Sequence, residues 1–174
     1  MALYLIELTP ATASKDEATA LIETVSNSLS EGAELIETQV SADHKLIFAI
    51  IESENTAFAP ALTAAIGERA SVVGPAEVRL VGAELDDIKQ PKKDADYLVE
   101  WDIPAEITME QYLTRKKANA PKYAEVPEVS FLRTYVREDT AKCLCFYDAP
   151  DEDAVLRARK AVSTPIDRLF KLHA

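Results

Sequence analysis

Six side chains that could do chemistry fall on expected strands, where they could share one surface. They are Glu7, Glu100, Arg133, Tyr135, Cys145 and Tyr147. Alternate residues of a strand project from the same face, so Arg133 and Tyr135 share a face, as do Cys145 and Tyr147. We expect the six to line a polar pocket for a small molecule or ion. The alternative is that Glu100 and Arg133 form a cross-strand ion pair and that the tyrosines only pack.

Cys143 and Cys145 are the only cysteines, and they are two residues apart in an expected strand. At that spacing the side chains point the same way but are too far apart and too parallel for an unstrained disulfide. Two thiolates without an imidazole are too few ligands for a zinc site. We therefore expect buried, reduced cysteines, as in a reducing compartment.

Other candidate groups are weaker. His44 is expected in a turn and His173 at the end of the chain, so we predict no metal site. The run Arg115-Lys116-Lys117 is most simply a solvated helix face, with an anion-steering patch as the alternative. The sequence contains no glycine-rich phosphate loop, nucleophile elbow or metalloprotease helix.

The elements that position these groups occur in two similar halves. Tyr4-Leu5-Ile6-Glu7 returns as Tyr97-Leu98-Val99-Glu100, which indicates an internal repeat. In the first half the pattern predicts strands over 3–8, 35–40, 45–52 and 76–81, with a helix capped at Ser14 and another over 55–68. In the second half it predicts strands over 97–102, 129–136, 142–148 and 168–172, with helices opening near Thr108 and Ala149.

Each half therefore has the order β-α-β-β-α-β, which is typical of a ferredoxin-like fold. We predict an α+β protein with one repeat over 1–83, a charged linker over 84–95 and a second repeat over 96–174. The strand over 46–51 is apolar on both faces, so both faces need cover. The other repeat's sheet is the expected cover, as in dimeric α+β barrels, either in a monomer with an internal pseudo-dimer or in a homodimer.

The charge excludes some partners. With a formal net charge of −11 and a pI near 4.7, the chain is unsuited to nucleic acid or an anionic membrane surface. No segment has the pattern of a signal peptide or the apolar length of a membrane span. We expect a cytoplasmic protein.

The second half also resembles a bacterial ferredoxin-like family of unknown function, whose members are often labelled nickel-binding proteins. The matching segments are 97–100, 134–136, 145–155 and 165–168. The resemblance implies site roles for Glu100, Tyr135, Cys145 and Tyr147, and nickel as a cofactor. Family members commonly carry histidines where this chain has Arg133 and Ala158. Because nickel prefers imidazole or thiolate ligands, we expect no cofactor here.

These observations favour a small cytoplasmic protein that binds a small molecule or ion in a polar pocket between or beside two ferredoxin-like sheets. One alternative is a cofactor-independent enzyme of the dimeric α+β barrel type, with Glu100 or Glu7 as base and Tyr147 or Arg133 polarising an oxygen. Another is an acidic protein-interaction module without a pocket.

Overall fold

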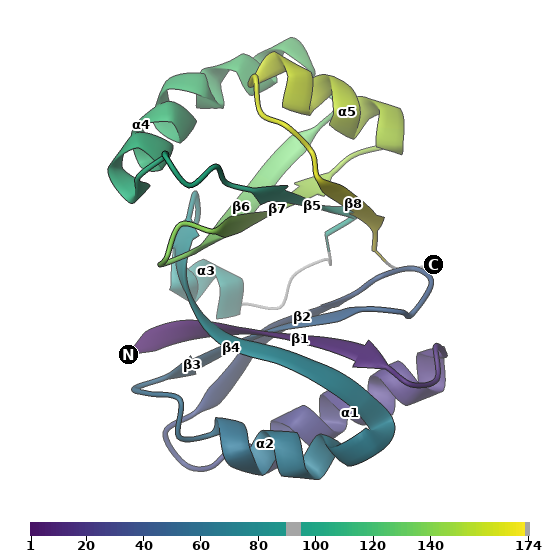
Figure 1. Cartoon of the computed structure of the whole chain (residues 1–174). Helices are drawn as coiled ribbons and strands as arrows, with labels where there is room; N and C mark the ends of the chain where they lie inside the picture. Colours follow the sequence, from purple (N-terminus) through teal and green to yellow (C-terminus); the bar gives the residue numbers. More distant parts are fainter. Residues whose placement is uncertain (90–94, 173–174) are drawn as a thin grey trace. The chain divides into compact units, whose positions relative to one another are not determined.

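The structure, a computed structural model, describes residues 1–89 and 95–172. These residues divide into two compact units, which are described separately (Figure 1). Unit 1 contains residues 1–78 and 85–89, and unit 2 contains residues 79–84 and 95–172.

Unit 1 has the predicted β-α-β-β-α-β order. Its elements are β1 (Ala2–Pro10), α1 (Lys15–Ser28), β2 (Glu34–Val40), β3 (Ile47–Ser53), α2 (Ala59–Ile66), the 3-10 turn η1 (Gly67–Arg69) and β4 (Ala70–Val81). The strands follow the order β2-β3-β1-β4 and pair antiparallel where their registers are defined.

The ends of the two helices follow from their sequences. Ser14 caps α1, since its Oγ accepts a hydrogen bond from the Glu17 amide at 3.1 Å. Pro60 is the second residue of α2, where its missing amide hydrogen removes no helical hydrogen bond. It therefore begins the helix and does not kink it.

The core of unit 1 lies between its sheet and helices α1 and α2. Ile6 and Leu8 of β1 are fully buried there with Leu21 of α1 and Leu62 of α2. Residues 47–51 of β3 are all buried, as the two-faced apolar pattern predicts.

Unit 2 repeats the order with β5 (Tyr97–Asp102), α4 (Met109–Asn119), the 3-10 segment η2 (Ala120–Glu125), β6 (Ser130–Arg137), β7 (Lys142–Asp148), α5 (Glu152–Ala161) and β8 (Arg168–Lys171). Its strand order is β6-β7-β5-β8, and the end of β4 precedes β6. A full capping box of Thr108 and Gln111 begins α4, and Asp151 caps α5.

The predicted linker holds more structure than its composition suggests. Its residues 85–89 form the short helix α3 (Leu85–Lys89), in which Lys89 pairs with Glu34 and Glu52. These residues belong to unit 1, whereas residues 79–83, predicted as part of the first repeat, belong to unit 2. Linker residues 90–94 and His173, which is expected at the end of the chain, lie outside the described residues.

In unit 2 the helices cover one face of the sheet (Figure 1). The buried strand residues on that face are Tyr97, Val99, Trp101, Val136, Cys143, Cys145 and Tyr147. They pack with Tyr112 of α4 and with Ala154, Val155 and Ala158 of α5. In the described part of the chain, no helix is both long and apolar enough to span a membrane.

Candidate functional site

The six predicted site residues do not form one cluster, so that part of the prediction is wrong. In the β5–β7 register Val99 lies opposite Cys145, whereas Glu100 lies opposite Leu144. Directly opposite residues in an antiparallel pair share a face. Cys145 and Tyr147 therefore lie on the helix-covered face of unit 2, and Glu100 lies on the other.

The remaining three predicted residues do not lie on the helix-covered face of unit 2 either; they are Glu7, Arg133 and Tyr135. Arg133 and Tyr135 are buried, and both contact Phe146, which neighbours Leu144 on the face of Glu100. Arg133 lies over the Phe146 ring at 5.0 Å and Tyr135 meets its edge, so both have packing roles. Glu7 belongs to unit 1, where it is half-buried on β1 opposite Phe48.

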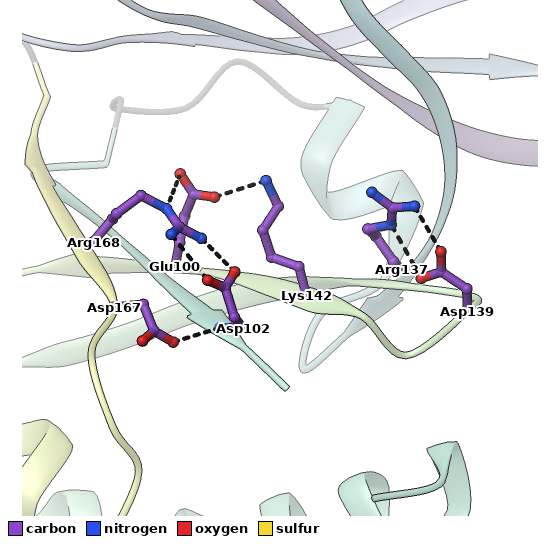
Figure 2. A network of polar contacts seen from close by, with 7 residues as sticks. All are labelled: Glu100, Asp102, Arg137, Asp139, Lys142, Asp167 and Arg168. Atoms are coloured by element: carbon purple, nitrogen blue, oxygen red, sulfur yellow. Dashed lines mark hydrogen bonds and ion pairs between the residues drawn. The ribbon is translucent and has the colours of Figure 1, made fainter. Parts of the chain in front are cut away.

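Glu100 is part of a network of charged groups at the sheet of unit 2 (Figure 2). Its carboxylate lies 2.8 Å from Lys142 Nζ and 3.5 Å from Arg168 Nε. Arg168 also holds Asp102 through two hydrogen bonds, and Asp167 accepts one from the Asp102 amide. The hydrogen bond from Arg168 lowers the pKa of Asp102, and the same contact raises the pKa of Arg168. The network is internally paired, which favours a structural role.

The helix-covered face of unit 2 contains a cavity of about 50 Å³. It is bounded by the sheet on one side and by α4, η2 and α5 on the other. Its lining consists of Trp101, Tyr112, Arg115, Lys116, Asn119, Ala120, Tyr123, Phe131, Cys143, Cys145, Arg159, Val162 and Thr164. Within the described part of the chain, the lining includes three basic residues and no carboxylate, although the whole chain is acidic.

Arg159 is the most deeply buried cation of this lining, with 3% of its surface exposed. Its Nη1 donates to Tyr147 Oη at 3.1 Å and approaches Cys145 Sγ at 3.5 Å, and its Nη2 donates to the Pro165 carbonyl at 2.6 Å. Its Nε has no hydrogen-bond partner among the described residues. A buried guanidinium thus keeps one donor unused.

Arg115 and Lys116 enter the lining from α4. Arg115 lies over the Trp101 ring at 5.4 Å and donates to the Ser163 carbonyl, and Lys116 Nζ lies 4.3 Å from the centre of the Phe131 ring. Within residues 1–89 and 95–172, no ion pair to a carboxylate forms at Arg115, Lys116 or Arg159. The cavity therefore carries uncompensated positive charge.

The two thiols lie in the same lining, with 4.0 Å between their sulfurs. Cys145 Sγ also accepts from Thr134 Oγ1 at 3.2 Å. The hydrogen bond from Cys143, with Lys116, Arg159 and Thr134 nearby, holds the pKa of Cys145 well below its usual range despite burial. The hydrogen bond to Cys145 and burial raise the pKa of Cys143. Of the two thiols, Cys145 therefore gives up its proton more readily than Cys143.

Three tyrosines add neutral phenols to the site. Tyr123 and Tyr147 share a hydrogen bond of 2.7 Å, and burial raises the pKa of Tyr123 to about 12 and that of Tyr147 well above its ordinary value. Burial and the neighbouring Cys145 and Cys143 sulfurs raise the pKa of Tyr112. The Tyr112 hydroxyl has no partner in hydrogen-bonding geometry within the described residues. The Cys143 thiol beside it interacts only weakly with this hydroxyl, which is therefore a second buried donor without a strong partner.

The run Arg115-Lys116-Lys117, expected as a solvated helix face or as an anion-steering patch, is only partly solvated. Arg115 and Lys116 are half-buried and line the cavity, whereas Lys117 is exposed as predicted. Arg159 and Tyr112 were not predicted as site residues. One signal was available for Arg159: it follows Val155 by one helical turn, in an otherwise apolar stripe of α5. A basic residue in such a stripe indicates a buried charge.

The nickel that the resemblance implies does not fit these residues. Arg133 stacks on Phe146 and Ala158 packs in the core, so neither position offers a ligand. The two thiols lie beside Arg159 and Lys116, which oppose a divalent cation. His44 lies in a turn of unit 1 with a φ of 61°. Over the described ranges, no cluster of three or more histidine, cysteine or acidic side chains could hold a metal.

Comparison with known proteins supports the fold and part of the resemblance. Residues 97–172 match the family described as SCO4226-like nickel-responsive proteins, which confirms the resemblance for the second half. No protein of curated function matches the chain.

Two crystal structures share the fold over nearly the whole chain. A presumed chlorite dismutase is 16% identical, with a TM-score of 0.58 over 100% of this chain and 96% of its own. A presumed monooxygenase from Fusobacterium nucleatum is 14% identical, with a TM-score of 0.53 over 98% of this chain and 90% of its own. These likenesses confirm the predicted class, which is α+β with tandem ferredoxin-like units of the dimeric α+β barrel type.

Proposed function

We propose that this protein binds a small anion in the cavity of unit 2. The observation that carries the proposal is a pair of buried donors without a hydrogen-bond partner of normal geometry, Arg159 Nε and the Tyr112 hydroxyl. Both side chains line one cavity, and no carboxylate lines it within the described residues. Buried donors are normally paired, because an unsatisfied one costs about 1–3 kcal/mol. An anion in the cavity would accept hydrogen bonds from both donors and would balance part of the surrounding positive charge.

The size of the cavity limits the ligand. A water molecule needs about 10–15 Å³ of such space, so a cavity of roughly 50 Å³ accepts about three to five non-hydrogen atoms. Formate, acetate, nitrate and bicarbonate are in this range. The aromatic walls of Trp101 and Phe131 favour a planar anion that can stack against them.

The net positive charge of the lining favours a ligand with a single negative charge. If Cys145 is a thiolate, it balances one of the three cations, and two positive charges remain. A singly charged anion between Arg159 and Lys116 would still leave the site positive. The same charges make a free metal cation a poor ligand.

The experiment uses Trp101, which is the only tryptophan and lines the cavity. Formate, acetate, nitrate and bicarbonate are titrated separately at constant ionic strength, with tryptophan fluorescence as the readout and calorimetry as confirmation. We expect saturable binding of at least one of them. A strictly linear response to all four anions would contradict the proposal.

A matched pair of variants tests the location. Lys116→Met removes a cation of the lining, whereas Lys117→Met removes its exposed neighbour. We expect Lys116→Met to weaken binding about tenfold, as loss of about 1.4 kcal/mol does, and Lys117→Met to leave it unchanged. Equal effects of the two variants would place the binding elsewhere.

Tyr112→Phe separates binding from stability. Among the described residues the hydroxyl has no partner in normal hydrogen-bond geometry and only the weak Cys143 thiol beside it, so its removal should change the free energy of unfolding little. Affinity should fall about three- to tenfold if the hydroxyl donates to the anion. Tyr4→Phe, in the core of unit 1, serves as the control.

The enzyme alternative has less support from the site. The two structural relatives are named for oxidative chemistry, but at this identity they show only the fold. Glu100 is already paired with Lys142 and Arg168, which disfavours it as a general base. The cytoplasmic location also remains a proposal, supported by the acidic charge and the reduced cysteines.

A further inference from the structure

The arrangement around Cys145 suits chemistry beyond the binding of an anion. Its sulfur lines the cavity and accepts from Thr134 Oγ1 at 3.2 Å and from Arg159 Nη1 at 3.5 Å. Donors that stabilise a thiolate make cysteine nucleophilic, and the thiolate is the reactive form. Both cysteines are buried, as the sequence predicts, but Cys145 differs from an inert buried cysteine because polar and cationic groups surround its sulfur.

The titratable and charged groups around this sulfur come from β7, α4, η2 and α5. They are Cys143 and Tyr147 on β7, Tyr112 and Lys116 on α4, Tyr123 on η2 and Arg159 on α5. The cations favour the thiolate, and the high pKa values of the tyrosines keep them neutral. Among the residues that the structure describes, no acidic side chain lines the cavity.

We propose that Cys145 is a peroxide-reactive site: hydrogen peroxide enters the cavity and oxidises the Cys145 thiolate to a sulfenate. Hydrogen peroxide has two non-hydrogen atoms and fits the available space of about 50 Å³. The side chains of Arg159 and Tyr112 line the same cavity, and within the described residues their Nε and Oη atoms have no hydrogen-bond partner of normal geometry. The site thus offers both a nucleophile and groups that polarise the bond to be broken.

The step is balanced without another reactant. The thiolate attacks one peroxide oxygen, so that an S–O bond forms and the O–O bond breaks. The proton on the attacked oxygen moves to the departing oxygen, which leaves as water. The sulfur is oxidised by two electrons, the peroxide is reduced, and the sulfenate keeps the negative charge beside Arg159.

Cys143 shares its proton with Cys145 but is poorly placed to resolve the product. The two side chains project from one strand, with their sulfurs 4.0 Å apart. Closure to a bond of about 2.05 Å would need distortion of β7. We therefore expect the sulfenate to persist until an external thiol reduces it.

The experiment exposes the reduced protein to hydrogen peroxide and traps sulfenic acid with a 1,3-diketone. Fragment mass spectrometry then assigns the adduct to Cys143 or Cys145. We expect adduct on Cys145 about tenfold faster than on Cys143, because only the thiolate reacts readily. Cys143→Ser should keep the reaction, and Cys145→Ser should abolish it.

Thr134→Val tests the positioning of the thiolate, since it removes a donor while keeping the shape of the side chain. We expect slower oxidation at neutral pH and a shift of its pH profile to higher pH, because the thiolate loses a hydrogen bond. Urea well below the unfolding transition should not change the rate in the parent protein. A rate that follows the unfolded fraction, or equal labelling of both cysteines, would overturn the proposal.

This inference uses the same cavity but does not require anion binding. If a small anion binds, saturating amounts should slow the oxidation of Cys145. If no anion binds and Cys145 is still oxidised selectively, the inference stands and the proposed function fails. If an anion binds and Cys145 remains unoxidised, the reverse holds.

Discussion

Arg159 on α5 donates a hydrogen bond of 3.1 Å to Tyr147 on β7, and this contact joins the helix layer of unit 2 to its sheet. The same guanidinium holds the Pro165 carbonyl at 2.6 Å. One buried side chain thus supports the wall of the cavity and supplies part of its charge. Its removal should affect both stability and chemistry.

Arg159→Met should lower the free energy of unfolding by about 2–4 kcal/mol, because the Pro165 carbonyl and the Cys145 sulfur lose a buried partner. Arg157→Met is the matched control. It removes an arginine two residues away that forms only surface pairs with Glu128 and Asp153. Chemical denaturation should show almost no effect of that control. Similar losses in both variants would mean that Arg159 has no special structural role.

Glu100→Gln should destabilise the protein by about 1–3 kcal/mol. The substitution leaves Lys142, which is mostly buried, without its 2.8 Å carboxylate partner, while Arg168 still holds Asp102. Glu138→Gln, which breaks the more exposed pair with Arg79, should have little effect. Thermal and urea unfolding of both variants measure the difference, and a neutral Glu100→Gln would show that the network contributes nothing to stability.

The Asp102–Arg168 pair should contribute to the fall in the free energy of unfolding at low pH. The hydrogen bond from Arg168 lowers the folded-state pKa of Asp102 below its unfolded value of about 3.9. The unfolded state therefore binds the proton more readily, so the contribution is present above about pH 4 and is lost as the pH falls through the folded pKa. Asp102→Asn should be less stable at neutral pH and should lose less stability on acidification.

Arg168→Lys tests the cause of this pH dependence. The substitution keeps the positive charge but loses the bidentate contact to Asp102. The free energy of unfolding should therefore depend less steeply on pH in the acid range than it does in the parent protein. Unfolding free energies measured at several pH values between about 2 and 7 give both slopes. Identical slopes in the parent protein and Asp102→Asn would exclude this pair as a contributor.

Gly82→Ala should disturb the cavity as well as the backbone. Gly82 has a φ of +87°, and a Cβ there would lie 2.7 Å from Cε1 of Phe131, which lines the cavity. We expect a loss of about 2–4 kcal/mol and altered Trp101 fluorescence. Gly32→Ala is the control, since Gly32 has a φ of +94° but no atom within 4 Å of the added Cβ. It should cost only about 1–2 kcal/mol of backbone strain.

The sequence by itself determined the order of elements in both units. Apolar spacing gave the strands and helices, and local capping pairs such as Ser14 with Glu17 and Thr108 with Gln111 marked where α1 and α4 begin. These signals are local, because each depends on residues within one or two turns of the chain. The repeated Tyr-Leu-aliphatic-Glu motif likewise indicated two ferredoxin-like units.

The tertiary structure alone decided which side chains share a surface. A shift of one residue in register moves a side chain to the other face of a sheet, and only the pairing of β5 with β7 places Cys145 opposite Val99, apart from Glu100. In the same way, only the packing of α4 and α5 on the sheet brings Lys116 and Arg159 to the cysteines. Register and packing depend on contacts between residues far apart in sequence, and the local patterns did not specify them.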